Sequence, residues 1–112
     1  MILKASDQTR ALIALTNLAD EHPHLPAPEM HVHGHISLSA MVTVEVVLHG
    51  DEDGFEAWRQ ALGIDPGDVQ QRQLSLGGRV SSAHTIRLGV AIVLTVHHRQ
   101  EAPPARVLAA VA

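Results

Sequence analysis

The sequence predicts an α+β domain of two layers, in which both helices lie on one face of a mostly antiparallel five-stranded sheet. The predicted order of elements is α-β-β-α-β-β-β. Three observations support it: two segments with apolar residues at helical spacing, five short segments typical of strands, and a length of 112 residues that allows one core. We therefore expect a single domain over residues 1–102 and an Ala- and Pro-rich tail over 103–112.

The first helix is predicted over residues 6–21. Ser6 or Asp7 can cap its free N–H groups, and Pro23 ends it because the residue before a proline disfavours helical geometry. Apolar residues at three- and four-residue spacing give the helix one inward stripe. This stripe consists of Ala11, Leu12, Leu15, Leu18 and Ala19.

Residues 30–37 and 41–49 alternate apolar and polar side chains, which predicts an antiparallel hairpin with a short turn near residues 39–40. Even-numbered residues are expected to face inward and odd-numbered residues outward. A register in which the paired numbers sum to 78 places Glu45 opposite His33.

The second helix is predicted to begin at the acidic run 51–53, because negative charge there complements the exposed N–H groups. Gly63 is suited to the left-handed geometry that commonly ends a helix. Its inward face is expected to hold Phe55, Trp58, Ala61 and Leu62. Pro66 and Gly67 then predict a turn.

Three further strands are predicted near residues 69–76, 79–87 and 89–98. The last is apolar on both sides, so we expect it to be central or to have its second face covered. A two-fold pairing of two copies would cover that face. The expected contact residues are Ala91, Val93 and Thr95. His97 and His98 are expected to end this strand in water.

Composition disfavours several functional classes. The chain has no Cys, so it has no disulfide and no thiol nucleophile, and no apolar run approaches the length of a membrane span. A net charge of −4 and the scarcity of aromatic residues disfavour nucleic-acid binding. No serine stands in a recognised nucleophile motif. We expect a soluble, cytoplasmic protein, and catalysis is not favoured.

A row of histidines gives the sharpest candidate site. His31, His33 and His35 alternate on one strand, so their imidazoles share a face and can converge on one cation. Glu45 would complete a three-His, one-carboxylate set suited to Zn or Ni. The alternative is a solvated strand face that happens to use histidine.

The segment Phe55-Glu-Ala-Trp-Arg-Gln-Ala-Leu-Gly-Ile64 resembles a helix-and-turn segment of small uncharacterised proteins of high-GC actinobacteria. The likeness covers about ten residues and a similar overall layout. It implies a bacterial or mobile-element origin, and it implies no activity and no site residues.

We therefore expect a small non-enzymatic binding or regulatory module that acts through protein–protein contacts and self-associates as a homodimer. Protonation of all nine histidines would move the net charge from −4 to +5, so association should change near pH 6. The alternative is a metal-binding or metal-sensing protein that uses the histidine row.

Overall fold

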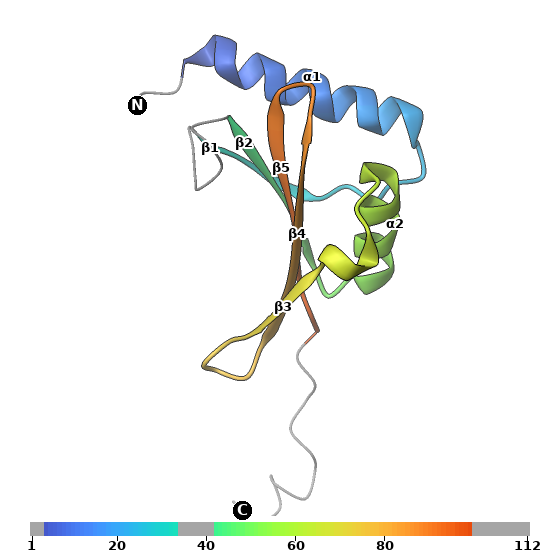
Figure 1. Cartoon of the computed structure of the whole chain (residues 1–112), viewed down its shortest axis with the longest axis vertical. Coiled ribbons are helices and arrows are strands. Elements are labelled where there is room, and N and C mark those ends of the chain that lie inside the picture. Colours follow the sequence, from blue (N-terminus) through green and yellow to red (C-terminus); the bar gives the residue numbers. More distant parts are fainter. Residues whose placement is uncertain (1–3, 34–41, 100–112) are drawn as a thin grey trace, which may run out of the picture.

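The structure, a computed structural model, describes residues 4–33 and 42–99 (Figure 1). Its element order confirms the predicted α-β-β-α-β-β-β arrangement, with a short 3-10 turn at Pro66–Asp68. The helices are α1 (Ala5–Glu21) and α2 (Glu52–Leu62). The strands are β1 (Glu29–His33), β2 (Thr43–His49), β3 (Gln70–Gln73), β4 (Arg79–Arg87) and β5 (Val90–His97). No described helix is long and apolar enough to cross a membrane.

The five strands form one sheet in the order β1-β2-β5-β4-β3. β5 is central, as its apolar residues on both sides predict. It pairs antiparallel with β4 but parallel with β2, so the sheet is mixed and not purely antiparallel. A parallel pair needs a long connection, and here that connection contains α2, β3 and β4.

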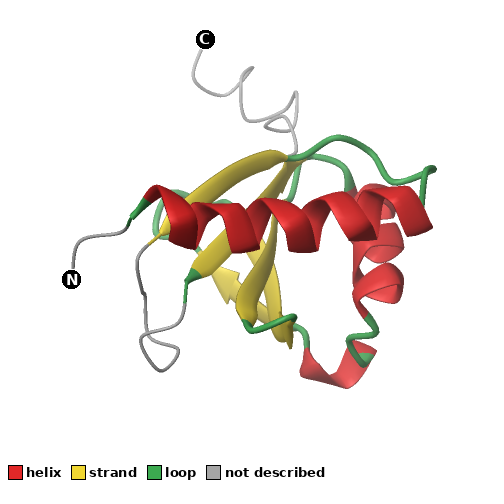
Figure 2. Ribbon diagram, turned by 90° about the horizontal axis from the view of Figure 1, so that it is seen from above, coloured by secondary structure: helices red, strands yellow, loops and turns green. Residues whose placement is uncertain are grey.

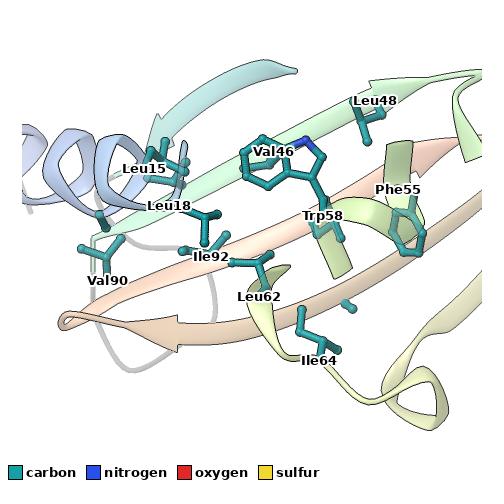
Figure 3. Close-up of a cluster of buried hydrophobic side chains, with 14 of the residues drawn as sticks. Leu15, Leu18, Val46, Leu48, Phe55, Trp58, Leu62, Ile64, Val90 and Ile92 are labelled. Carbon is teal, nitrogen blue, oxygen red and sulfur yellow. The ribbon is translucent and has the colours of Figure 1, made fainter. Parts of the chain in front are cut away.

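Both helices cover the same face of the sheet, and the core lies between these two layers (Figure 2). Figure 3 shows how side chains from the two helices meet the central strands. The members of this cluster drawn with labels include Leu15 and Leu18 of α1, Trp58 and Leu62 of α2, and Val46 and Ile92 of the sheet. The predicted inward direction of even-numbered β2 residues is thus confirmed.

The buried stripe of α1 is rotated from the predicted one. It consists of Ala11, Ala14, Leu15 and Leu18. Leu12 is 55% exposed and Ala19 is also exposed, so their predicted inward positions are wrong. The small Ala14 lets the helix lie close to the sheet. The N-cap prediction also fails, because Lys4 occupies that position and Asp7 accepts a hydrogen bond from its backbone N–H at 3.0 Å.

α2 begins and ends as predicted. The Asp51 side chain accepts a hydrogen bond from the N–H of Gly54 at 2.8 Å, and Gly63 adopts a left-handed φ of 72°. The helix also lies close to the connector before β1. A Cβ added to Gly54 would approach Pro26 Cγ to 2.9 Å, and the Trp58 indole N–H donates to the Pro26 carbonyl at 2.9 Å. Trp58 thereby fixes the start of the β1 edge against the core.

The register of the first hairpin differs from the predicted one by two residues. His31 pairs with Glu45 and His33 pairs with Thr43, so Glu45 is not directly opposite His33. A two-residue shift leaves every side chain on its predicted face, so the alternation alone could not decide between the two registers. Residues 34–41, which include the predicted turn and His35, lie outside the described residues.

Candidate functional site

The sheet face opposite the helices, here called the open face, carries the histidines of β1 and β2. Glu29 lies at its edge and accepts hydrogen bonds from two of them. His31 Nε2 lies 3.1 Å from Glu29 Oε1, and His49 Nε2 lies 3.0 Å from Glu29 Oε2. These bonds, the one from His49 first, lower the pKa of the Glu29 carboxyl below its usual value. Glu29 was not among the predicted site residues, because β1 begins one residue before the predicted strand.

The predicted metal set is only partly tested by this geometry. His31 and His33 lie on the open face as predicted, with ring centroids 6.3 Å apart. His31 is directed to Glu29, and His33 Nε2 lies 3.9 Å from Glu45 Oε1, beyond hydrogen-bond distance. Among the described residues, no group of three His, Asp or Glu is placed to hold a metal ion. His35 lies outside them.

The predicted contact residues of β5 also lie on the open face. Ala91 is fully buried and Thr95 is 7% exposed within the single chain, because neighbouring strands already cover these small side chains. Val93 is half-buried and lines a polar hollow of about 470 Å³. Other residues around this hollow include Glu45, Gln70, Arg72, Ser82 and His97. Of the three, Val93 has the most surface left for a partner.

An apolar groove of about 340 Å³ lies between α1 and the connector that leads into β1. Two large side chains on it are unexpectedly open to solvent, Leu12 at 55% and Met30 at 48%. The groove is further lined by Leu15, Thr16, Ala19, Leu25, Pro26, Ala27, Pro28 and Trp58. Exposed apolar surface gathered in one place is typical of a contact surface for another macromolecule.

A third cluster joins β4, the end of β5 and α2. Ser81 Oγ lies 2.6 Å from His98 Nε2, and His98 Nδ1 lies 2.9 Å from Glu52 Oε1. The hydrogen bond from His98 lowers the pKa of Glu52. The His98 side chain is only 12% exposed, so the prediction that it ends the strand in water is wrong; His97, by contrast, is exposed.

The order serine, histidine, carboxylate is that of a hydrolase triad, but its surroundings oppose that chemistry. Glu52, Asp53 and Glu56 all line the adjoining pocket, and their negative charge would destabilise an oxyanion. Ser81 also lies within a regular strand and is 2% exposed. The cluster is better explained as a clasp that ties the start of α2 to the sheet.

No protein-family model matches the chain, and no curated protein or solved structure matches it either. The resemblance of residues 55–64 to small actinobacterial proteins therefore stays a prediction. Its Phe55 and Trp58 are core residues in the structure, which accounts for their presence without a functional role.

Proposed function

We propose that the protein is a small binding module that self-associates through protein–protein contacts at its β1 side. The observation that carries this proposal is the apolar groove, on which Leu12 and Met30 stay about half exposed. Met30 belongs to β1, the strand at one end of the sheet, so apolar surface and an edge strand adjoin. A second copy of the chain is the proposed occupant.

The β1 side replaces the β5 residues as the centre of the proposed contact. Burying Ala91 and Thr95 against a partner would remove little further surface from water, because both are already buried. Met30 and Leu12 have that surface to lose, and burial of a side chain of this size stabilises an interface by roughly 1.5–3 kcal/mol when complete. A cytoplasmic location remains part of this proposal.

Sedimentation velocity over a concentration series tests the proposal. We expect the wild type to form dimers and Met30→Lys to be monomeric at the same concentrations, because a charge would enter the apolar contact. Leu76→Lys is the matched control, since Leu76 is 91% exposed on the turn between β3 and β4, far from β1 in the sheet order. A wild type that stays monomeric throughout would contradict self-association.

Self-association should also weaken between pH 8 and pH 5.5. Histidine is the side-chain type whose charge changes between about pH 5 and pH 8, and copies that meet at β1 would bring the histidines of that strand close together. Within residues 4–33 and 42–99, the carboxylates paired with the rings of His31 and His33 are Glu29 and Glu45, and Glu29 also contacts His49 of β2. An equal dimer fraction at both pH values would contradict this expected pH dependence.

Metal binding stays the alternative, and it rests on the shared face of His31 and His33 together with His35, which lies outside the described residues. Calorimetry with Zn²⁺ or Ni²⁺ separates the two hypotheses. Binding with one-to-one stoichiometry that is lost in the His33→Ala, His35→Ala double variant would favour the predicted histidine row. Heat that survives in that variant would contradict a site built on the histidine row.

A further inference from the structure

We infer that two copies pair through β1 itself, antiparallel, with a two-fold axis that passes beside His31 at right angles to the sheet. This inference rests on the proposed self-association and specifies its geometry. The two five-stranded sheets would then join edge to edge, and the helices of both copies would lie on the same side of the combined sheet.

The position of β1 in the sheet makes this pairing available. Within the described residues β1 has one strand neighbour, β2, so half of its backbone N–H and C=O groups are directed away from any strand. Edge strands in this condition readily accept another strand unless charge, proline or a bulge prevents it. From Glu29 to His33 the strand contains no proline, and Glu29 is its one carboxylate.

The sequence of β1 is complementary to itself when it is turned about His31. In that register Met30 faces Val32 of the partner subunit, and Glu29 faces His33 of the partner subunit. The first pair is apolar and lies on the helix-covered face. The second joins a carboxylate to an imidazole on the open face. Apolar cross-strand pairs, and pairs that join a carboxylate to a hydrogen-bond donor, both favour this antiparallel register.

An unsatisfied atom supports the same register. His33 Nε2 is buried without a hydrogen-bond partner, the one such side-chain atom among the described residues. Buried polar nitrogen atoms normally have a partner. The proposed pairing brings Glu29 of the partner subunit opposite His33, and a rotation of the imidazole would present Nε2–H to that carboxylate, which can accept the hydrogen bond.

The apolar groove extends the contact on the helix-covered face. Met30 lies both on β1 and on the groove, next to the exposed Leu12 of α1. When two β1 strands pair about His31, each Met30 lies beside Val32 of the partner subunit and loses exposed surface. The edge pairing thereby buries apolar area in addition to forming backbone hydrogen bonds.

Single-cysteine cross-linking tests the register, because the natural chain contains no cysteine. In an antiparallel pair a residue on the two-fold axis faces its own copy at a Cα separation of about 4.5–5.5 Å, within the range of a disulfide. We expect His31→Cys to form a covalent dimer under mild oxidation. Glu29→Cys should not, because the two copies of residue 29 would be about 13 Å apart along the strands.

The double variant Glu29→Cys, His33→Cys gives the matched positive control, since residue 29 of each copy would then face a cysteine. Gln71→Cys on β3 reports on the opposite edge of the sheet. Circular dichroism confirms that each variant folds, which is expected because the His31 and Glu29 side chains are about half exposed. We expect several-fold more covalent dimer in His31→Cys and in the double variant than in the other two.

The outcomes separate this inference from the proposed function. A dimer in sedimentation with no cross-link in His31→Cys would overturn the β1 pairing and leave self-association standing. A cross-link only in Gln71→Cys would move the contact to β3. If the wild type and His31→Cys are both monomeric and no variant cross-links, the pairing and the proposed function fail together.

Discussion

The two edges of the sheet differ in chemistry, although both belong to the same sheet. β3 consists of Gln70, Gln71, Arg72 and Gln73, all of them exposed. β1 has a half-exposed methionine on one face and a carboxylate–imidazole network on the other. Only β1 adjoins the apolar groove.

This difference shows which edge is protected against pairing. A short strand of polar residues with an arginine offers a partner little apolar surface, and natural proteins protect edges in this way. β1 has no such arginine, carries a carboxylate only at its first residue, and keeps Met30 in contact with water. One edge of this protein is therefore suited to end the sheet, and the other is suited to extend it.

The largest expected effect concerns Trp58, which holds the connector before β1 against the core. Trp58→Ala removes a buried aromatic ring and its hydrogen bond to the Pro26 carbonyl, so we expect the free energy of unfolding to fall by about 3–5 kcal/mol. Urea denaturation measures the change. Gln71→Ala at the exposed β3 edge is the control and should change the same quantity by less than about 0.5 kcal/mol. Equal losses of stability in Trp58→Ala and Gln71→Ala would show that the β1 edge is held to the core no more firmly than the β3 edge.

The next effect concerns the cluster of Ser81, His98 and Glu52, which joins β4, the end of β5 and α2. Ser81→Ala leaves the nearly buried His98 Nε2 without its partner, and we expect it to lower the free energy of unfolding by about 1–2 kcal/mol. Ser82→Ala on the open face is the matched control with a smaller expected change. The same protein, treated with a serine-reactive phosphonate, should stay unlabelled. Labelling at Ser81 would refute its role as a clasp.

A smaller effect distinguishes the edges by pH. The Glu29 carboxylate accepts hydrogen bonds from His49 and His31, and these hold its pKa below the usual value of 4.5. Ionised Glu29 therefore stabilises the folded state relative to the unfolded state. This contribution is fully present above pH 4.5 and is lost as the pH falls through the lowered folded pKa. Glu29→Gln should therefore reduce the urea midpoint at pH 7, and the reduction should become smaller as the pH falls below 4.5. A reduction of the same size at pH 7 and at pH 3 would contradict the assignment.

The smallest expected effect sharpens the comparison most directly. Gln71→Met gives β3 an apolar side chain on the helix-covered face, where β1 carries Met30. Without the groove and without a complementary strand sequence, we expect no gain in association. The dimer dissociation constant of this variant, measured by sedimentation, should stay within about twofold of the wild-type value, a free-energy difference of less than about 0.5 kcal/mol. A clear gain would show that exposed methionine alone is sufficient.

The sequence predicted most of the local structure because side-chain period and capping chemistry are local properties. The bounds of β4 match the prediction, and Asp51 and Gly63 bound α2 as expected. β3 ends three residues early, since Leu74 turns back to hydrogen-bond with Gly78. Pairing between distant strands was harder, and the parallel neighbours β2 and β5 were not predicted.

The candidate site was less predictable for a related reason. The direction of His31 and His33 follows from alternation, but their partners depend on register and on residues far along the chain. His49 meets Glu29 across twenty positions, and His98 meets Glu52 across forty-six. One local signal was available: Glu29 and His31 are two residues apart, so a strand that begins at 29 places them on one face.

The parallel neighbours in the middle of the sheet also constrain the order in which the chain can fold. Val44 and Val46 pair with Ile92 and Leu94. The edge of β2 that faces away from β1 therefore has no strand partner until β5 has left the ribosome. Pairings so distant in sequence form slowly and leave apolar edges uncovered meanwhile. The central strand pair therefore cannot be completed until the chain has been synthesised through His97.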